Sequence, residues 1–171
     1  GLNPAWFPKA KVKSLFSTPF SSVTTSFLHR DDRFFNTNKI EQFTGRKLGV
    51  VKSYHYPEIA SYIESGKIET VQVADQEMLL NKLIAGELEH IVINRQFAQY
   101  WLHQRNKSNF VKFGHDLSSV PISIRVQTKH SDMLPRLNKA IEKLLADGSI
   151  SKIFNPLYLD KISEDIDLEK L

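Results

Sequence analysis

The chain has 171 residues, of which 41% are hydrophobic and 25% charged, the ordinary balance of a globular domain with a real core. Its net charge of +4 is spread over Lys and Arg residues scattered among acids, which argues against a nucleic-acid partner. It has no cysteine, which excludes disulfides and thiolate chemistry, and no apolar run approaches the roughly 18 residues of a membrane span.

The N-terminal part of the chain predicts irregular structure followed by one strand. Residues 1–22 contain three prolines, which interrupt any long element. Residues 23–30 are rich in β-forming side chains and predict a strand. A polar loop is expected over residues 31–38 and a short helical turn over residues 39–43.

The stretch from Gly45 to Arg95 alternates apolar strands with amphipathic helices, the pattern of a parallel sheet covered by helices. Gly49, inside the first strand, suggests that another backbone approaches closely. Asp75 has the position of a helix N-cap. Strands are expected over residues 47–52, 68–73 and 90–93, and helices from Pro57 to Gly66 and from Asp75 to Gly86.

The C-terminal part predicts one more amphipathic helix, two strands and a last long helix. The long helix begins after Asp132 as its N-cap and ends at Gly148. His115 and Asp116 fall in a loop, and the tail from Asp160 is acidic. Residues 96–104 predict a helix with Phe97, Tyr100, Trp101 and Leu102 mostly inward, residues 110–113 and 122–127 strands, and residues 149–155 one or two helical turns.

Known catalytic and metal-binding motifs are missing from the sequence. No histidine pair has the zinc-protease spacing, and there is no G-x-S-x-G nucleophile elbow. Neither a G-x-G-x-x-G loop nor a P-loop is present. The sequence therefore predicts no catalytic residues, no metal site and no cofactor, and a protein that is not an enzyme.

Two segments at the carboxyl ends of the expected parallel strands carry the best signal of a site. Ser53, Tyr54 and His55 follow a buried strand and precede a helix, whose N-terminus favours an anion. Asn94 and Arg95 end the third strand, and an arginine offers a planar fork to a carboxylate or phosphate. The alternatives are a loop that only connects two elements and an ordinary surface arginine.

The order of several motifs resembles the extracellular solute-binding proteins of family 3, the periplasmic receptors of polar amino-acid ABC transporters. The stretch LFSTPFSSVTTSFLHRDD is similar to the family's first interdomain crossing, F-S-x-P-Y. It is followed by GRKLGVVKS, DQEMLLNKLIAGELEHIVIN, ISIRVQTKH and LNKAIEKLLADGSISKIFNPLY in the family's order. The resemblance runs from about Pro4 to Tyr158.

The resemblance implies an α/β fold of the periplasmic-binding-protein type II, with one complete lobe and remnants of the other. The complete lobe, a central mixed sheet flanked by helices, is expected over residues 23–121. Residues 1–22 correspond to the end of the first lobe and the approach to the hinge, and residues 122–159 to a hinge strand and the C-terminal helices of the first lobe. Residues 160–171 form the acidic tail. The chain thus resembles a truncated member, a fragment, or a variant without most of its first lobe.

The positions that hold the ligand in the family differ here. The position of the arginine that clamps the ligand carboxylate is Ala10, and Ser53-Tyr54-His55 stand where the family has Gly-Ser/Thr-Thr. The acid that holds the α-ammonium is matched by Arg95, or by Asn94 with a one-residue shift. An arginine there would repel an ammonium, so we expect a carboxylate, another anion or no ligand rather than a standard amino acid.

The resemblance favours a periplasmic solute-binding protein that serves an ABC transporter permease or a sensor, with the leader either removed or not part of this sequence. Without such a leader, the sequence alone would also suit a cytoplasmic protein. The alternative is an orphan lobe that acts as an interaction or regulatory module, dimeric through the apolar face of its long helix. An enzyme fused to such a lobe, such as a lytic transglycosylase, is disfavoured because no added catalytic domain is recognised.

Overall fold

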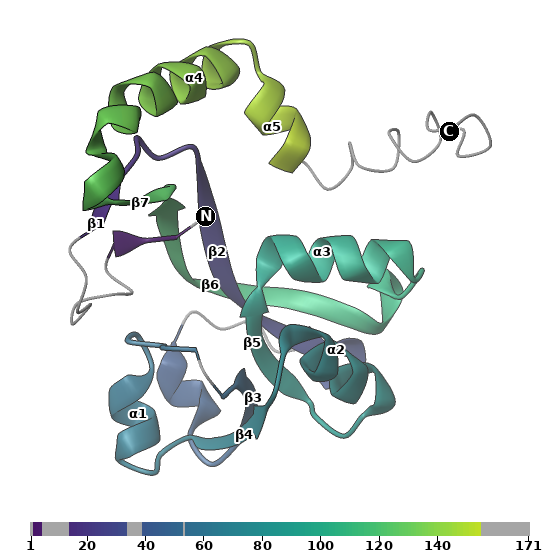
Figure 1. Ribbon diagram of the computed structural model, residues 1–171. Coiled ribbons are helices and arrows are strands. Elements are labelled where there is room, and N and C mark those ends of the chain that lie inside the picture. The colour runs from purple at the N-terminus through teal and green to yellow at the C-terminus, as the bar shows by residue number, and fades with distance from the viewer. Residues whose placement is uncertain (1, 5–13, 34–38, 53, 155–171) are drawn as a thin grey trace. The chain divides into compact units, whose positions relative to one another are not determined.

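The structure is a computed structural model, which describes residues 2–4, 14–33, 39–52 and 54–154. The chain divides into two compact units, which we call the sheet unit (Thr24–Ser119) and the terminal unit (Gly1–Val23 with Val120–Leu171). Both boundaries fall inside long strands, β2 (Ser21–Arg30) and β6 (Val111–Ile122). Figure 1 labels the elements of each unit.

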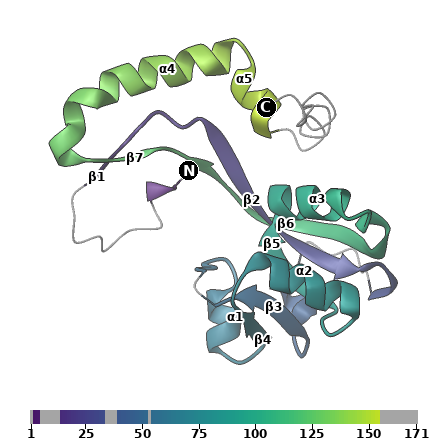
Figure 2. The same ribbon diagram turned by 45° about the vertical axis from the view of Figure 1, so that its right-hand side comes forward.

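A five-stranded mixed sheet with the strand order β4-β3-β5-β2-β6 forms the centre of the sheet unit (Figure 2). β3 pairs in parallel with β4 and with β5, whereas β2 is antiparallel to β5 and places Thr25 opposite Asn94. The carboxyl ends of the three parallel strands therefore meet at one edge, which is also where β2 begins. These strands are β3 (Lys47–Val51), β4 (Glu69–Val73) and β5 (His90–Asn94).

Helices cover both faces of this sheet, and each face has its own hydrophobic cluster. The first cluster joins Leu28 and Ile91 to α2 (Gln76–Ala85) and α3 (Arg95–Gln104). The second cluster joins neighbouring strand positions, such as Val92, to Ile59 and Phe43 beside α1 (Ala60–Glu64) and η3 (Ile40–Phe43). Because successive strand side chains point to opposite faces, a sheet covered on both sides needs continuous apolar strands. The unit also contains the short 3-10 helices η2 (Asp31–Arg33) and η4 (Ser108–Phe110).

The strands and helices expected between Gly45 and Arg95 are present, with two corrections. α1 begins at Ala60, so Pro57 lies in a turn before the helix and not in its first turn. The close neighbours of Gly49 are side chains and not a backbone. A Cβ at this position would lie 2.7–2.9 Å from the side chains of Leu88, Ile91 and Leu79.

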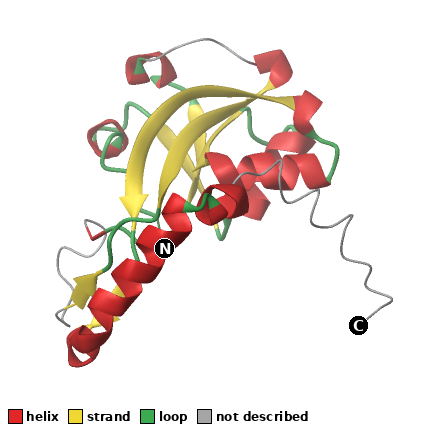
Figure 3. Ribbon diagram, turned by 90° about the horizontal axis from the view of Figure 1, so that it is seen from above, coloured by secondary structure: helices red, strands yellow, loops and turns green. Residues whose placement is uncertain are grey.

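The region after α3 differs more from the sequence expectation. The strand predicted over residues 110–113 continues without interruption to Ile122, so His115 and Asp116 lie in β6 and not in a loop. Figure 3 shows the two longest strands, which the sheet order places side by side. The mostly inward face predicted for α3 is confirmed for Phe97, Trp101 and Leu102, whereas Tyr100 is 42% exposed.

The described part of the terminal unit contains a two-stranded antiparallel sheet, a 3-10 helix and two α-helices. β1 (Ser14–Phe16) pairs with β7 (Arg125–Gln127), after which the chain forms η5 (Thr128–Met133), α4 (Leu134–Ala146) and α5 (Ser149–Phe154). Asp132 lies inside η5, and α4 has no side-chain cap, so the predicted capping role of Asp132 is wrong. Gly148 ends the helix with a positive φ of 75°.

Some expectations concern residues outside the described part, namely Ser53, Ala10, Asn155 and the acidic tail from Asp160. Within the described residues, no helix combines the length and apolar character needed to cross a membrane.

Candidate functional site

The edge of the sheet unit where β3, β4 and β5 end carries a group of polar side chains. Two of them cap helices that begin at this edge. Asp75 Oδ1 accepts a hydrogen bond of 2.8 Å from the N–H of Met78, and Asn94 Oδ1 accepts one of 2.8 Å from the N–H of Phe97. Asp75 was predicted as a cap and is confirmed. The positive dipole ends of α2 and α3 therefore face this edge.

Gln76, the first residue of α2, connects the ends of the strands. Its Oε1 accepts a hydrogen bond of 3.0 Å from the N–H of Asn94, and its Nε2 lies 3.4 Å from the hydroxyl of Tyr54. One amide side chain thus joins the loop after β3 to the end of β5. The sequence analysis missed Gln76, although its place directly after the N-cap at a strand end was a signal that could have found it.

Tyr54 and His55, two of the predicted ligand residues, lie exposed in the loop after β3, with 52% of Tyr54 accessible. The backbone N–H of Tyr54 donates a hydrogen bond to Val51 O at 3.1 Å. The neighbouring Tyr56 is anchored, because its hydroxyl accepts a hydrogen bond of 3.1 Å from the N–H of Val51. Burial raises the pKa of this hydroxyl to about 12. Tyr54 and His55 thus offer an exposed hydroxyl-bearing side chain and an exposed imidazole ring.

Arg95, a predicted ligand residue, is the first residue of α3, and its side chain donates hydrogen bonds to neighbouring residues. Its Nε donates to Ser26 Oγ at 2.9 Å and to Asp116 Oδ1 at 2.8 Å. Its Nη2 donates to Asp116 Oδ1 at 2.6 Å and to Gly114 O at 3.3 Å. The guanidinium lies 4.5 Å from the ring centroid of Phe113. The arginine therefore connects α3 to β2 and β6.

Asp116 stays ionised next to this arginine. Its partial burial raises the pKa of its carboxyl, but hydrogen bonds from Ser26 and Arg95 and the positive charge of Arg95 outweigh that effect. The pKa of Asp116 is therefore below its ordinary value. Sequence reasoning missed this partner because it lies 21 residues from Arg95 along the chain.

The polar edge continues to β2 and β6. The N–H of Thr24 donates to Gln96 Oε1 at 3.2 Å, and the hydroxyls of Thr24 and Ser119 lie 3.2 Å apart. None of these three residues was expected at the site. Together with Tyr54 and Asn94 they form a series of neutral hydrogen-bonding groups, suited to a small polar molecule. Within the described residues, no group of three or more His, Asp or Glu side chains is placed to hold a metal ion.

The architecture of the chain is shared with solved structures of binding proteins. An ancestral arginine-binding protein bound to arginine superimposes with a TM-score of 0.69 at 19% identity, over 90% of this chain and 66% of that protein. The fold is that of a periplasmic-binding-protein type II lobe. The GluR0 ligand-binding core in complex with L-glutamate gives a TM-score of 0.72 at 13% identity, again over 90% of this chain and 66% of its own length.

A third structure is AbpA of Streptococcus pneumoniae, an amino-acid ABC transporter substrate-binding protein bound to L-arginine. It superimposes with a TM-score of 0.69 at 14% identity, over 88% of this chain and 62% of AbpA. The chain thus spans 62–66% of the length of these three proteins. No protein-family model matches the sequence, and no curated protein matches it. At these identities the likeness establishes the fold alone.

Proposed function

We propose that this chain is a non-enzymatic solute-binding component of the kind that serves an ABC transporter or a sensor outside the cytoplasmic membrane. The observation that carries the proposal is the polar edge where β3, β4 and β5 end, because ligands of open α/β sheets bind at the carboxyl ends of strands. The similar folds include a protein bound to arginine and one in complex with L-glutamate. The proposed ligand residues are Ser53, Tyr54, His55, Asn94 and Arg95.

We infer that the solute is small and is polar or anionic, with a carboxylate favoured over a standard amino acid. Two carboxylates near the edge are engaged, Asp75 as the cap of α2 and Asp116 with Arg95. An ammonium group would therefore meet competition for each of them, whereas an anion meets the N-termini of two ten-residue helices. In this proposal the Tyr54 hydroxyl and the His55 ring orient the solute.

Calorimetry on the whole chain tests this function, with arginine, glutamate, glutamine, a dicarboxylate and a sugar acid as probes. We expect saturable heat with a carboxylate, and at least tenfold weaker binding in Tyr54→Phe and in His55→Ala. Tyr100→Phe is a matched control, because this tyrosine is similarly exposed on α3. Absence of heat with every probe, or equal losses in the control, would contradict the proposal.

A second function, a protein-interaction module, is favoured by exposed apolar side chains. α4 presents Leu144 and Leu145 at 42% and 40% exposure, and α5 presents Ile153 and Phe154 at 58% and 42%. Exposed apolar patches of this kind mark interaction surfaces. A second copy of the chain is the proposed partner, and a dimer would bury this face by a self-complementary contact.

Light scattering over a range of concentrations tests the module, with the double variant Leu145→Lys, Ile153→Lys. We expect a dimer in the parent chain and a monomer in the variant. Met78→Lys, on an exposed apolar position of the sheet unit, serves as the control and should remain dimeric. A parent chain that stays monomeric at all concentrations rules the dimer out.

A further inference from the structure

Three amide side chains at the strand edge are turned the same way. Gln76 Oε1 accepts a hydrogen bond of 3.0 Å from the backbone N–H of Asn94, and Asn94 Oδ1 accepts one of 2.8 Å from the N–H of Phe97. Gln96 Oε1 accepts one of 3.2 Å from the N–H of Thr24. A backbone N–H can only donate, so the amide oxygen must face it in each case. The NH2 group of each side chain therefore lies on the side away from its backbone partner.

For Gln76, this orientation decides what the hydroxyl of Tyr54 can do. Gln76 Nε2 lies 3.4 Å from that hydroxyl and carries only N–H groups, so the hydroxyl oxygen must accept. A bond of this length is weak, but it still fixes which partner donates. The phenolic proton then points away from Gln76. No described residue accepts a hydrogen bond from that proton, and Tyr54 is 52% exposed, so its O–H is left to donate to a molecule at the edge.

Both ends of this series of hydrogen bonds are held by secondary structure. Gln76 is the first residue of α2 and directly follows the N-cap Asp75. Asn94 is the last residue of β5, where it lies opposite Thr25 of β2, and its side chain caps α3. The direction of the hydrogen bonds is therefore set before a solute arrives, which lowers the cost of binding one that fits.

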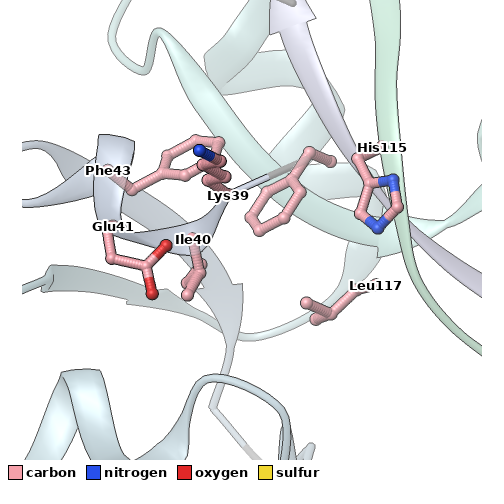
Figure 4. A pocket seen from close by; sticks show the side chains of 7 residues that line it. Lys39, Ile40, Glu41, Phe43, His115 and Leu117 are labelled. Atoms are coloured by element: carbon pink, nitrogen blue, oxygen red, sulfur yellow. The ribbon is translucent and has the colours of Figure 1, made fainter. Parts of the chain in front are cut away.

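The hollow beside η3, which Figure 4 shows from close by, suits a hydrogen-bond acceptor less well than this edge. Its floor residues Phe27 and Phe43 are at most 3% exposed, so little of either ring is open to contact. A hydrogen bond from the Tyr62 hydroxyl is the main cause that lowers the pKa of the Glu41 carboxyl, which lies at the opening of the hollow. An acceptor group would meet this ionised carboxylate there.

We infer that Gln76 is a positioning residue for solute selection, because it fixes the Tyr54 hydroxyl as a hydrogen-bond donor and so favours a solute with an acceptor, such as a carboxylate oxygen, at this point. The inference rests on the proposed function and adds to it the residue that sets the preference. Gln76 acts through Tyr54 and does not itself contact the solute. The NH2 group of Asn94, turned away from the cap of α3, offers donors of the same kind.

The substitution Gln76→Glu reverses the direction of these hydrogen bonds at nearly constant size. One carboxylate oxygen can still accept from the N–H of Asn94, while the other accepts from the Tyr54 hydroxyl and turns its proton inward. The added charge lies in the first turn of α2, where the helix dipole stabilises it, so the variant should fold. Calorimetry on the whole chain with glutarate, a dicarboxylate, should show at least tenfold weaker binding than in the parent chain.

Two controls separate the direction of the hydroxyl from the added charge. Gln72→Glu makes the same substitution at an exposed position of β4 and should weaken glutarate binding only slightly. In a Tyr54→Phe background there is no hydroxyl to turn, so Gln76→Glu should cause a much smaller further loss than in the parent chain. An equal loss with and without the hydroxyl, or an equal loss in Gln72→Glu, would overturn the inference.

Amide spectra of the isotope-labelled chain without solute give an independent readout. Tyr54→Phe should move the side-chain NH2 signals of Gln76 upfield and leave the backbone N–H signal of Asn94 in place. Tyr100→Phe, at a similarly exposed tyrosine of α3, should move neither. Unchanged Gln76 signals in Tyr54→Phe would overturn the inference. Shifted signals in a chain that binds none of the calorimetric probes would instead contradict the proposed function, so the two failures are distinguishable.

Discussion

The sheet unit and the terminal unit differ in how much of their apolar surface they bury. In the sheet unit, helices on both faces enclose residues such as Leu28 and Leu83, which have no exposed surface. In the terminal unit, α4 also has an apolar stripe along one side. Within the described residues of α4, however, only Ile141 is buried. An amphipathic stripe therefore predicts a helix, but its burial depends on a second layer that the stripe itself does not specify.

The two units should differ most in the free energy of unfolding that is lost when one leucine of each is replaced by alanine. Leu83→Ala leaves a cavity in the closed core and should lower the free energy of unfolding by about 3–4 kcal/mol. Leu145→Ala, at a position 40% exposed, should cost less than about 1 kcal/mol. Urea unfolding followed by far-ultraviolet circular dichroism measures both. Equal losses would mean that α4 is as well enclosed as α2.

Acid should destabilise the sheet unit through two buried histidines. The Nδ1 atoms of His29 and His90 lie 2.9 Å apart, so one must donate and the other accept. Burial is the main cause that lowers the pKa of both histidines to about 4. His90 and Arg46 lower the pKa of His29 further, and Arg46 and Arg33 that of His90.

The direction of this pH dependence follows from whether the unfolded or the folded chain binds more protons. Below the ordinary pKa of 6.5 the unfolded chain protonates His29 and His90, while the folded unit stays neutral until about pH 4. Stability is therefore lost as the pH falls from about 6.5 to about 4, by a few kcal/mol on the order-of-magnitude scale of such shifts. Glu89, 3.9 Å from His90, would moderate the loss. Urea midpoints across this range measure it, and His103→Gln at an exposed position should keep the same profile. A flat profile in the parent chain would contradict the prediction.

A smaller loss of stability should distinguish α2 from α4, for both of which the sequence predicted an aspartate cap. Asp75→Ala removes the cap of α2 and should cost about 1 kcal/mol. Asp132→Ala should change stability by less than about half a kcal/mol, because this residue lies inside η5 and caps no α-helix. Thermal unfolding of the two variants makes the comparison. A loss in Asp132→Ala as large as that in Asp75→Ala would restore the capping role.

A small loss of stability is also expected when the Arg95–Asp116 pair is broken. The side chain of Asp116 is 49% exposed, so Asp116→Asn should cost less than about 1 kcal/mol. The same change removes a competing anion from Arg95 and should strengthen binding of a carboxylate solute severalfold. Asp31→Asn is the control, because Asp31 forms an ion pair with Lys112 at 48% exposure. Weaker carboxylate binding in Asp116→Asn would exclude a role for Arg95 in holding an anion.

Much of the fold follows from local patterns in the chain. The apolar runs of β3 and β5 and the cap at Asp75 were correctly placed, because strand and helix periodicities are properties of neighbouring residues. The length of β6 was missed because Gly114 and Pro121 interrupt its pattern. Glycine and proline both disfavour a strand interior. In β6 they are accommodated because the strand pairs with β2, which local sequence patterns do not reveal.

The candidate site was predictable only in part. The position of Asn94 and Arg95 at the end of β5 follows from the alternation of strands and helices and was predicted from the sequence. The direction of the Arg95 side chain and the bridging role of Gln76 did not follow. Their partners, Asp116 and Asn94, lie 21 and 18 residues away along the chain, and only folding brings them together.

The amino-acid sequence by itself determined the α/β class, the parallel strands and the edge at which polar residues gather, because hydrophobic periodicity and helix caps act over a few residues. The tertiary structure decided which of those polar groups are engaged and which are exposed. It engaged Arg95 with Asp116 and left the side chain of Tyr54 half exposed, with its hydroxyl near Gln76. It also decided that the stripe of α4 stays largely uncovered, since burial requires an opposing layer and not only an apolar face.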